Sequence, residues 1–512
     1  MEKENRQLVW FRRDLRLEDH MPLIKAASGG PVMLVYIIDP DYWAAPDRSA
    51  RQFQVFRHSI NTLRRELQDR EGQLIVRVGK TLEVMKTLFS ELSFQVIHTH
   101  EVTETSCGMG ISERIKEWSL SNNIGFAEYP SNGVFRDLKN RDGWAARWNK
   151  RMKQGPLVSP ESVQFVHAES TPGWESWWPS IVNGTLVSEN KNAWWAMNSE
   201  QVLDDFLNRR GLSYHTDMSS PLSAEEACSR LSTHLAVGAI SMRQIVSRVT
   251  DRQDYLRSLD KNIRGTALKA LGAYKSRLHW HCHFIQKLES EPAIEFENMS
   301  KAFNGIRENS FNEEYFQAWC RGETGYPFVD ACMRYLRETG WINFRMRAML
   351  VSFASYDLWL HWDRTAKFLA TQFLDYEPGI HYSQFQMQSG TTGINTVRIY
   401  SPEKQSNDQD PDGVFIRRWV PELESLGAEH IHAPWKLSVT DQKRYGVVLD
   451  NHYPAPIVDH QRAAKEARTR IGQIKKSNSA REEKKIILKK HGSRKGRDKP
   501  RKTDKQTDLF EQ

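Results

Sequence analysis

Cysteine is scarce in this chain of 512 residues. The five that occur are scattered, and no two form a Cys-x-x-Cys pair: Cys107, Cys228, Cys282, Cys320 and Cys332. An odd, dispersed set of thiols argues against a disulfide scaffold and against a cysteine-based zinc site. The sequence therefore predicts reduced thiols in a cytoplasmic protein, and it predicts no metal site.

Long apolar runs are absent as well. No stretch reaches the roughly 18 apolar residues that a membrane-spanning helix needs. The first residues, MEKENRQLVWF, lack the apolar core of a secretion signal. The dinucleotide-binding pattern Gly-x-Gly-x-x-Gly is also missing, and the pair Gly29-Gly30 indicates only a turn. These absences predict a globular protein without a membrane partner, long enough for two or three domains.

Positive charge is concentrated at one end of the chain. The formal net charge is +8, yet residues 461–512 alone hold 18 Lys and Arg against 7 Asp and Glu. The stretch 475–505 has so few apolar residues that burial cannot order it. We therefore expect a basic, disordered tail over residues 456–512. Such a tail is a solvated extension, and it can also serve as a loose electrostatic tether to nucleic acid.

The first 130 residues alternate short apolar runs with amphipathic patterns. Candidate strands are 7–11, 32–38, 74–79, 95–100 and a weaker 125–130, with helical periodicity at 51–70 and 82–92. This alternation predicts an α/β domain over residues 1–130 with a parallel, Rossmann-like sheet.

A basic run, WFRRDLRLEDHMPL (10–23), follows the first strand, where α/β sheets form ligand crevices. Its arginines alternate with acidic residues. We expect structural ion pairs here rather than catalytic groups, joining Arg12, Arg13 and Arg16 to Asp14, Glu18 and Asp19.

Residues 131–199 have a different composition. They contain seven tryptophans, several prolines and glycines, and little periodicity. This pattern predicts a long connector whose tryptophans pack against neighbouring surfaces. From 200 to 455 helical patterns dominate and no convincing strand occurs, so we expect an all-α second domain.

The region 324–423 carries the strongest motifs. Apolar residues keep helical spacing through TGYPFVDACMRYLRETGWINFRMRAMLVSF (324–353), yet arginines are threaded around the same turns. FLDYEPGIHYSQFQMQSGTTG (373–393), RIYSP (398–402) and GVFIRRWVPEL (413–423) follow. Composition alone fits an ordinary amphipathic helix pair with solvated charges. The order and spacing of these motifs instead resemble the DNA photolyase/cryptochrome family, in which they surround FAD.

The resemblance covers roughly residues 7–130 and 200–455. It implies an N-terminal α/β domain, an all-helical FAD-binding domain over 200–455, and FAD as the cofactor. A second, light-harvesting chromophore of folate or deazaflavin type is compatible with the resemblance, although no residue of the first domain identifies it.

The segment ACSRLSTHLAVGAISMRQ (227–244) would by itself be a capped apolar helix. The resemblance implies that this segment cradles the FAD diphosphate and that a preceding tyrosine lies against the cofactor. By position, the implied cofactor contacts are Tyr214, Cys228, Ser229, Arg230, Leu231 and Ser232. The family usually has Thr at the position of Cys228.

A cluster of potential ligands lies in LGAYKSRLHWHCHFIQKL (271–288), at His279, His281, Cys282 and His283. On one helix these positions point to different faces, so they do not converge on a metal. The resemblance implies instead that Tyr274 and His281 contact the cofactor and that Trp280 forms a wall of the lesion cavity. Arg277 stands where class I photolyases present a carboxylate to the pyrimidine dimer, which reverses the charge.

The loop Asp375-Tyr376-Glu377 keeps the family's two carboxylates. In a dry pocket such groups can accept hydrogen bonds from flavin or ribose, and turn capping is the alternative. The resemblance places Arg345 near the flavin's reactive edge and His381 opposite the flavin N5. Photolyases have Asn there and plant cryptochromes have Asp, so His381 is the candidate for tuning the flavin's redox state.

The family reduces its flavin through three tryptophans, of which only the middle one, Trp362, is matched. The flavin-proximal tryptophan aligns with Phe385. Tyr382, Trp359 and Trp341 are candidate substitutes, and core packing is the default explanation for such residues.

The resemblance also implies a DNA-facing set: Arg277, Trp280, Phe344, Arg345, Met387 and Gln405. Met387 replaces the second tryptophan of the lesion cavity, and Phe344 replaces a frequent Asn. These replacements, together with Arg277, favour either a different lesion or a cryptochrome-type receptor that has lost repair.

We expect a monomeric photolyase that repairs UV-induced pyrimidine lesions in single- or double-stranded DNA, with the lesion flipped out over FAD. The implied catalytic residues are Trp280, Arg345, His381 and Trp362. A blue-light receptor is the alternative function. A nucleotide-using α/β enzyme unrelated to light would explain residues 1–130 but not 324–423.

Overall fold

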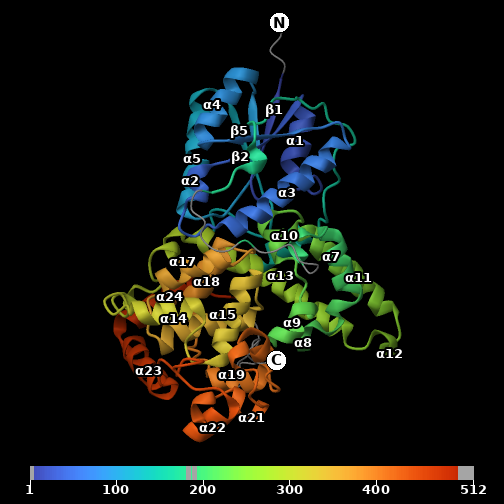
Figure 1. Cartoon of the computed structure of the whole chain (residues 1–512). Coiled ribbons are helices and arrows are strands. Elements are labelled where there is room, and N and C mark those ends of the chain that lie inside the picture. Colours follow the sequence, from blue (N-terminus) through green and yellow to red (C-terminus); the bar gives the residue numbers. More distant parts are fainter. Residues whose placement is uncertain (1–4, 180–185, 187–192, 494–512) are drawn as a thin grey trace.

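The computed structural model describes residues 5–179, 186 and 193–493, and it shows an α/β domain above a helical domain (Figure 1). Five parallel strands form one sheet in the order β3-β2-β1-β4-β5. They are β1 (Gln7–Phe11), β2 (Val32–Ile38), β3 (Leu74–Val78), β4 (Val96–His100) and β5 (Gly125–Tyr129). The predicted strands and the predicted parallel sheet are confirmed.

Helices cover both faces of this sheet (Figure 1). Val9 and Phe11 pack with α1 (Met21–Gly29) and α3 (Ala50–Gln68), whereas Leu8 and Trp10 pack with α4 (Thr81–Leu92) and α5 (Ser106–Ser121). Alternate residues of a strand face opposite sides, so both sets are buried and β1 is apolar from Leu8 to Phe11. A short α2 (Pro40–Trp43) follows β2.

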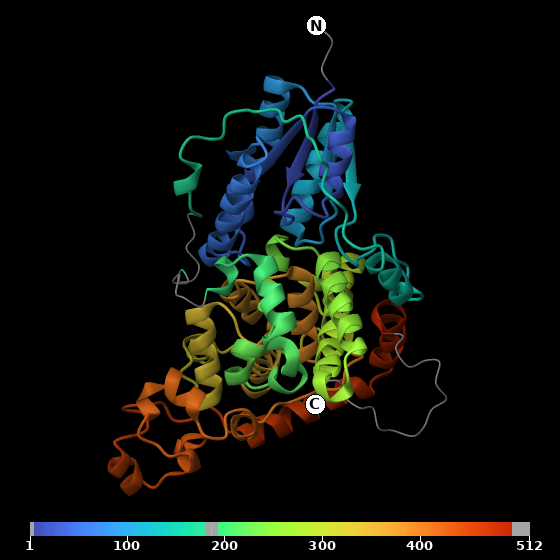
Figure 2. The ribbon, with the colours of Figure 1, turned by 90° about the vertical axis from the view of Figure 1, so that its right-hand side faces the viewer.

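The connector packs against both domains, and its course over the α/β domain is visible in Figure 2. Trp174 and Trp195 are buried in the core beside the sheet. Trp144 and Trp148, on α6 (Trp144–Met152), are buried in the helical domain. The expected packing role of these tryptophans is confirmed.

The second domain contains no strand among the residues that the structure describes. Its first helices are α7 (Ser199–Asn208), α8 (Tyr214–Asp217), α9 (Pro221–Ala227), α10 (Ser232–Val237), α11 (Met242–Ser258), α12 (Lys261–Arg264), α13 (Ala267–Ser290) and α14 (Glu313–Arg321). Then come α15 (Pro327–Thr339), α16 (Phe344–Ser352), α17 (Trp362–Gln372), α18 (Pro378–Gln388), α19 (Pro402–Gln409), α20 (Val414–Trp419), α21 (Ala428–Ile431) and α22 (Val439–Tyr445). None of the described helices is long and apolar enough to cross a bilayer.

The arginines threaded through α15 and α16 bind separate partners. Arg334 forms an ion pair with Glu422 at 2.9 Å, and Arg347 forms one with Asp375 at 2.8 Å. Each guanidinium therefore reaches a different neighbouring segment, which explains why these arginines do not share one solvated face.

Helix α3 joins the two domains by capping helix ends. Arg51 Nη1 donates to the carbonyl oxygen of Gln372 (3.1 Å), and its Nη2 donates to that of Arg337 (2.8 Å). Gln52 Nε2 donates to the carbonyl oxygen of Ala370 (2.7 Å). The last carbonyls of a helix have no partner within it, so side chains of the α/β domain satisfy α15 and α17.

The predicted disorder of residues 456–512 is wrong for most of that range, because α23 (His460–Lys476) and α24 (Asn478–His491) pack on the helical domain (Figure 1). Ala464, Ala467 and Ile471 form a narrow buried stripe on α23, and Ile487 is buried on α24. The prediction relies on the low overall apolar content of the segment, and such an average does not reveal a stripe only one residue wide. Residues 494–512, the rest of the predicted tail, lie outside the described residues.

Ile486 and Ile487 test this packing as a matched pair, since their side chains are 67% and 6% exposed. Ile487 packs with Leu288, Ile294 and Met299. We expect Ile487→Ala to lower the free energy of unfolding by about 2–4 kcal/mol through the cavity that it leaves. Ile486→Ala should change it by less than about 0.5 kcal/mol. Urea denaturation measures both, and equal effects would contradict the packing.

Candidate functional site

A cavity in the helical domain brings most of the predicted site residues together. Its wall includes twelve of them: Tyr214, Cys228, Ser232, Arg277, Trp280, His281, Phe344, Arg345, Asp375, Tyr376, Glu377 and His381. These side chains come from α8, α13, α16, α18 and the segments between them. Residues up to 167 positions apart in the sequence thus form one site.

Seven predicted site residues do not line this cavity: Ser229, Arg230, Leu231, Tyr274, Trp362, Met387 and Gln405. Tyr274 lies behind Tyr214, with ring centroids 5.6 Å apart, and Leu231 is fully buried in the same core. The Arg230 guanidinium stacks on Trp341 at 3.7 Å. These side chains support the wall from behind.

Trp362 is also behind the wall. Its Nε1 donates to Asn298 Oδ1 (2.7 Å), and its ring centroid is 6.4 Å from that of Tyr382. Met387 and Gln405 both lie outside the wall. Gln388, which the sequence analysis misses, lines the cavity instead of Met387.

Close contact between α13 and α18 sets the shape of the cavity. A Cβ atom on Gly379 would lie only 2.5 Å from the Cα of Ile285, so any larger residue would force the two helices apart. Trp280 and His281 from α13, and His381 and Gln384 from α18, line the space beside this contact.

An aromatic surface forms one side of the cavity. Trp280 and Phe284 stack with centroids 5.6 Å apart and an interplanar angle of 26°. The Arg277 guanidinium lies 5.8 Å from the ring of Phe344. Flat apolar faces next to cationic groups suit a ligand that has a planar ring system and a negatively charged group close to that ring.

Asp375 is held by a two-pronged ion pair. Arg347 Nη1 donates to Asp375 Oδ1 (3.0 Å) and Nη2 donates to Oδ2 (2.8 Å). Arg347 Nε donates to the carbonyl oxygen of Ile342 (2.7 Å). The carboxylate is thereby fixed in the wall, and it retains lone pairs for a ligand. The sequence analysis misses Arg347 as its partner.

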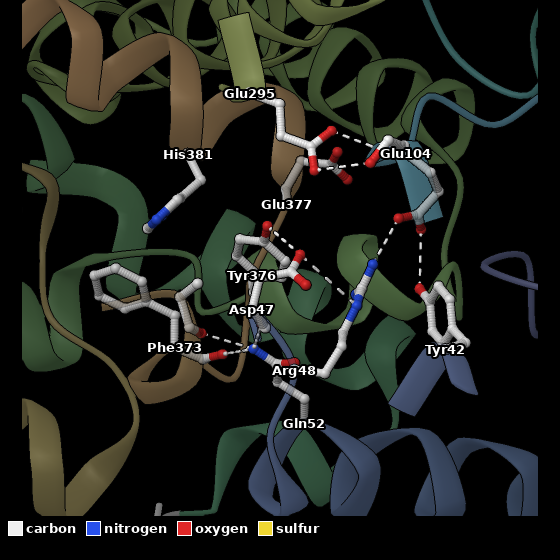
Figure 3. Close-up of polar contacts among 12 residues, drawn as sticks. Tyr42, Asp47, Arg48, Gln52, Glu104, Glu295, Phe373, Tyr376, Glu377 and His381 are labelled. Carbon is white, nitrogen blue, oxygen red and sulfur yellow. Dashed lines mark hydrogen bonds and ion pairs between the residues drawn. The ribbon is translucent and has the colours of Figure 1, made fainter. Parts of the chain in front are cut away.

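The other two residues of the acidic loop contact the α/β domain. Glu377 Oε2 accepts a hydrogen bond from Arg13 Nη2 (2.8 Å), and the Tyr376 hydroxyl donates to Asp47 Oδ2 (2.7 Å; Figure 3). Burial raises the pKa of Glu377, opposed by the charge of Arg13. The loop thus joins the cavity to the N-terminal domain.

The arginines of the 10–23 run bind mainly other groups than the carboxylates predicted for them. Arg13 forms ion pairs with Glu104 and Glu377. Arg16 donates to the carbonyl oxygens of Gly238 (3.0 Å), Glu18 (3.1 Å) and Asp19 (3.1 Å), so it contacts two of the predicted residues through their backbone. Arg12 donates to Ser112 Oγ (2.6 Å). The structural role is retained, but the carboxylates that pair with Arg13 come from distant segments.

His381 lies in the wall as a neutral imidazole. Its Nε2 is 2.8 Å from the carbonyl oxygen of Ala366, so Nε2 carries the proton and Nδ1 is the acceptor. Burial lowers the pKa of His381 to about 4. The residue implied to face the flavin N5 is therefore uncharged at neutral pH.

The histidines of α13 point to different surroundings, as helix geometry predicts. His279 packs against Trp144 and Trp148, whereas His281 lines the cavity. His283 lies against Trp280. The three rings do not converge on one point.

A buried cluster that the sequence analysis misses joins Asp14, His20 and His100 below the sheet crevice. Asp14 Oδ2 lies 3.0 Å from His20 Nε2 and 2.7 Å from His100 Nδ1. Burial alone would raise the pKa of Asp14, but the hydrogen bonds from the histidines hold it well below its usual range. The protons of both rings already satisfy this carboxylate.

Several buried polar atoms of the wall have no hydrogen-bond partner among the described residues. They are Gln384 Nε2 and Oε1, Asn343 Oδ1 and His281 Nδ1. A buried polar group without a partner costs about 1–3 kcal/mol, so this cavity is built for a guest that forms hydrogen bonds. With the aromatic surface beside them, these atoms fit a flavin nucleotide.

Comparisons with known proteins agree with this site. Residues 7–139 match the family description "DNA photolyase", and residues 274–473 match "FAD binding domain of DNA photolyase". Deoxyribodipyrimidine photo-lyase of Escherichia coli (strain K12) is 28% identical over 480 residues, which cover 89% of this chain and 96% of that protein.

Solved structures match over nearly the whole chain. A bacterial class III photolyase from Agrobacterium tumefaciens is 26% identical, with a TM-score of 0.77 over 93% of this chain and 99% of that one. An archaeal photolyase from Sulfolobus tokodaii with two FAD molecules is 25% identical, with a TM-score of 0.73 over 91% and 100%.

Fold and site together define a flavoprotein whose helical domain binds FAD beneath an α/β domain. The two family matches span well over half of the residues. The chain belongs to the DNA photolyase/cryptochrome family.

The low pKa of His381 predicts a pH effect on stability. Below pH 6.5 the unfolded chain protonates this histidine, whereas the folded protein resists protonation down to about pH 4. The stability of the native protein therefore falls as the pH drops through this window. We expect His381→Asn to reduce the loss between pH 7 and 4.5 by about 2 kcal/mol.

Urea unfolding at the two pH values measures this loss. His167→Asn, at an exposed position, is the matched control and should leave the loss as in the wild type. An unchanged loss in His381→Asn would show that His381 is not held neutral by burial.

Proposed function

We propose that this chain is a blue-light-driven photolyase that repairs UV-induced pyrimidine lesions in DNA. One observation supports this proposal most. The cavity that carries the FAD-pocket elements also carries the stacked Trp280 and Phe284, with Arg277 and Arg345 in the same wall. A cofactor and a flipped base could therefore lie against one another in a single space.

FAD would be held by Tyr214, Cys228 and Ser232 on one side and by the Arg347–Asp375 pair on the other. When bound and reduced, FAD supplies on illumination the electron that opens the lesion bond, and the electron then returns. The protein's part is to exclude water and to hold both rings in place. The imidazole of His381 is buried and neutral, and its Nε2–H donates to the carbonyl oxygen of Ala366. This bond fixes the orientation of the ring and leaves Nδ1 as an acceptor.

The lesion would stack on Trp280 after it leaves the duplex. Arg277 and Arg345 are half-buried in the wall, where they could contact the phosphates that flank a flipped nucleotide. Phosphate contacts position the strand without reading its sequence. This arrangement suits repair of damage in any sequence context.

A cryptochrome-type receptor is the second candidate. Arg277 reverses the charge that class I photolyases aim at the dimer, and Met387 lies outside the wall. A protein with these changes could keep FAD and lose repair of cyclobutane dimers. Repair is favoured because the aromatic surface and both arginines are retained in one cavity.

Three further points belong to the same proposal. The protein would act as a monomer, in the cytoplasm, on damaged DNA that is single- or double-stranded. A second chromophore of folate or deazaflavin type would lie at the carboxyl edge of the sheet, where strand order reverses. Arg12, Tyr42 and Glu104 line a small pocket at that edge.

Irradiation of the purified, FAD-loaded protein with dimer-containing DNA tests the repair proposal. We expect the lesion to disappear under blue light and to persist in the dark, with both single- and double-stranded substrates assayed. Photoreduction of the bound flavin with undiminished lesion would refute repair and favour the receptor.

Arg277 provides a sharper test of the DNA contact. We expect Arg277→Gln to weaken binding of lesion DNA about tenfold and to lower the slope of log K against log salt by about 1. Arg418→Gln is the matched control, because Arg418 is an exposed arginine paired with Glu225 outside the cavity. DNA titrations at several salt concentrations measure the affinity and the slope for the wild type and for both variants. If Arg277→Gln has the same slope as the wild type, Arg277 does not contact the DNA phosphates.

Arg277→Glu tests the choice of lesion. If this variant gains repair of pyrimidine dimers, the charge at position 277 determines which lesion is repaired.

A further inference from the structure

The cavity lacks a tryptophan where the family's relay delivers an electron to the flavin. Phe385 occupies that position, lines the cavity and lies 4.7 Å from His381 between ring centroids. A phenyl ring has no heteroatom and is far harder to oxidise than an indole or a phenol. Another wall residue must therefore act as the nearest donor if the bound flavin is to be photoreduced.

Tyr376 is placed for this role. It lines the same cavity, and its ring centroid is 5.2 Å from that of His381. Its hydroxyl donates a 2.7 Å hydrogen bond to Asp47 Oδ2, and both side chains are buried (Figure 3). A phenol that loses an electron becomes a strong acid, so a carboxylate already hydrogen-bonded to it is an immediate proton acceptor.

A buried cation lies next to this carboxylate. Arg48 Nε lies 3.9 Å from Asp47 Oδ2, and the Arg48 guanidinium is 5.3 Å from the centre of the Tyr376 ring. Arg48 is itself anchored by Glu104, at 2.6 Å. Burial, followed by the charge of Asp47, raises the pKa of Tyr376 well above its usual value. The phenol thus keeps its proton until it is oxidised.

We propose that Tyr376 and Asp47 form a proton-coupled electron donor to the flavin, in place of the missing tryptophan. One electron passes from the Tyr376 ring to the photoexcited flavin, while the O–H bond breaks and its proton moves to Asp47 Oδ2. A neutral tyrosyl radical and a protonated carboxyl group result. When the electron returns, the proton returns to the phenol. With an added thiol, a hydrogen atom from the S–H group restores the tyrosine and leaves a thiyl radical, Asp47 releases its proton to solvent, and the electron stays on the flavin.

Trp341 and Tyr382 are the competing donors. Trp341 lines the cavity, but the Arg230 guanidinium stacks on its ring at 3.7 Å, and a cation in that place opposes the loss of an electron from the indole. Tyr382 contacts Tyr376 through the side-chain hydroxyl and lies 6.4 Å from Trp362 between ring centroids. Tyr382 does not line the cavity, so it suits a second step outward to Trp362 rather than the first step. The proposal rests on FAD binding within the proposed function and is independent of lesion repair.

Time-resolved absorption and electron paramagnetic resonance on the FAD-loaded full chain, without DNA, test the pair. In the wild type we expect a tyrosyl radical after a light pulse, formed more slowly in deuterated water. Tyr376→Phe and Asp47→Asn should each lower the rate of its formation, and with it the yield, by about tenfold or more, a barrier increase above about 1.4 kcal/mol. Asp47→Glu, which restores a carboxylate, should recover part of it.

Tyr453→Phe is the matched control. The Tyr453 hydroxyl also donates to a buried carboxylate, Asp330 Oδ2 (2.5 Å), but Tyr453 does not line the flavin cavity. This variant should keep the wild-type radical yield. FAD content and thermal unfolding of every variant show whether the fold is intact.

Several results would overturn the assignment. A radical lost in Tyr382→Phe and kept in Tyr376→Phe would make Tyr382 the first donor. An indole radical in the wild type would show that a tryptophan is the donor. Formation of the tyrosyl radical at the same rate in deuterated water would show that proton transfer to Asp47 is not coupled to the electron transfer. A chain that binds no FAD would refute this proposal and the proposed function together. FAD-loaded protein that forms the tyrosyl radical without repairing lesions would refute repair alone.

Discussion

The buried ion pairs of Arg13 hold this architecture together. The guanidinium binds Glu104 of its own domain (3.0 Å) and Glu377 of the acidic loop (2.8 Å). Its remaining donors reach the carbonyl oxygens of Ala236 (2.9 Å) and Tyr376 (3.2 Å). Burial alone would lower the pKa of Arg13, but the charges of Glu377 and Glu104 outweigh it and raise the pKa. A buried cation is tolerable only when it is satisfied in this way.

This one residue makes the flavin site depend on both domains. Glu377 and Tyr376 line the cavity, yet their side chains bind Arg13 and Asp47 of the α/β domain. Removing one partner would leave a buried charge uncompensated, which costs about 3–5 kcal/mol. The α/β domain is therefore a structural part of the flavin pocket, whatever chromophore it holds itself.

Much of the fold could be predicted because its signals are local. The central strands β1 and β2 are buried on both faces and show as apolar runs, and the divergence of His279, His281 and His283 follows from helix geometry alone. The motif order of 324–423 identified the FAD pocket. The α23–α24 helices were missed because Ala467 and Ile471 occupy a narrow stripe among many charges. Gln384 and Gln388 share a helix face with His381, a signal that spacing could have revealed.

Other features lay beyond any local signal. Arg13 binds Glu377, which is 364 positions away in the sequence, and Tyr376 binds Asp47, which is 329 positions away. The acids next to Arg13 in the sequence were the obvious partners, but neighbours on a loop need not face one another. Only the packing of the two domains brings these side chains together. For the same reason the resemblance could assign the carboxylates of the acidic loop to the cofactor without showing that Glu377 is shared with the other domain.

The charge around the cavity limits what the flavin can do. His381 is neutral, so it contributes no positive charge near the position implied for N5. The cations Arg13, Arg48 and Arg347 are each paired with a carboxylate. An extra electron on the flavin would thus be stabilised by hydrogen bonds, by dipoles and by the wall cations Arg277 and Arg345, rather than by His381 or by these paired arginines. When Tyr376 loses an electron and its proton moves to Asp47, the net charge of the Tyr376–Asp47 pair changes from −1 to 0. No charged tyrosyl radical cation is left beside the flavin. The same pairing of electron and proton suits both repair and signalling, so in the proposed function the choice of substrate would depend on Arg277 and the aromatic surface beside it.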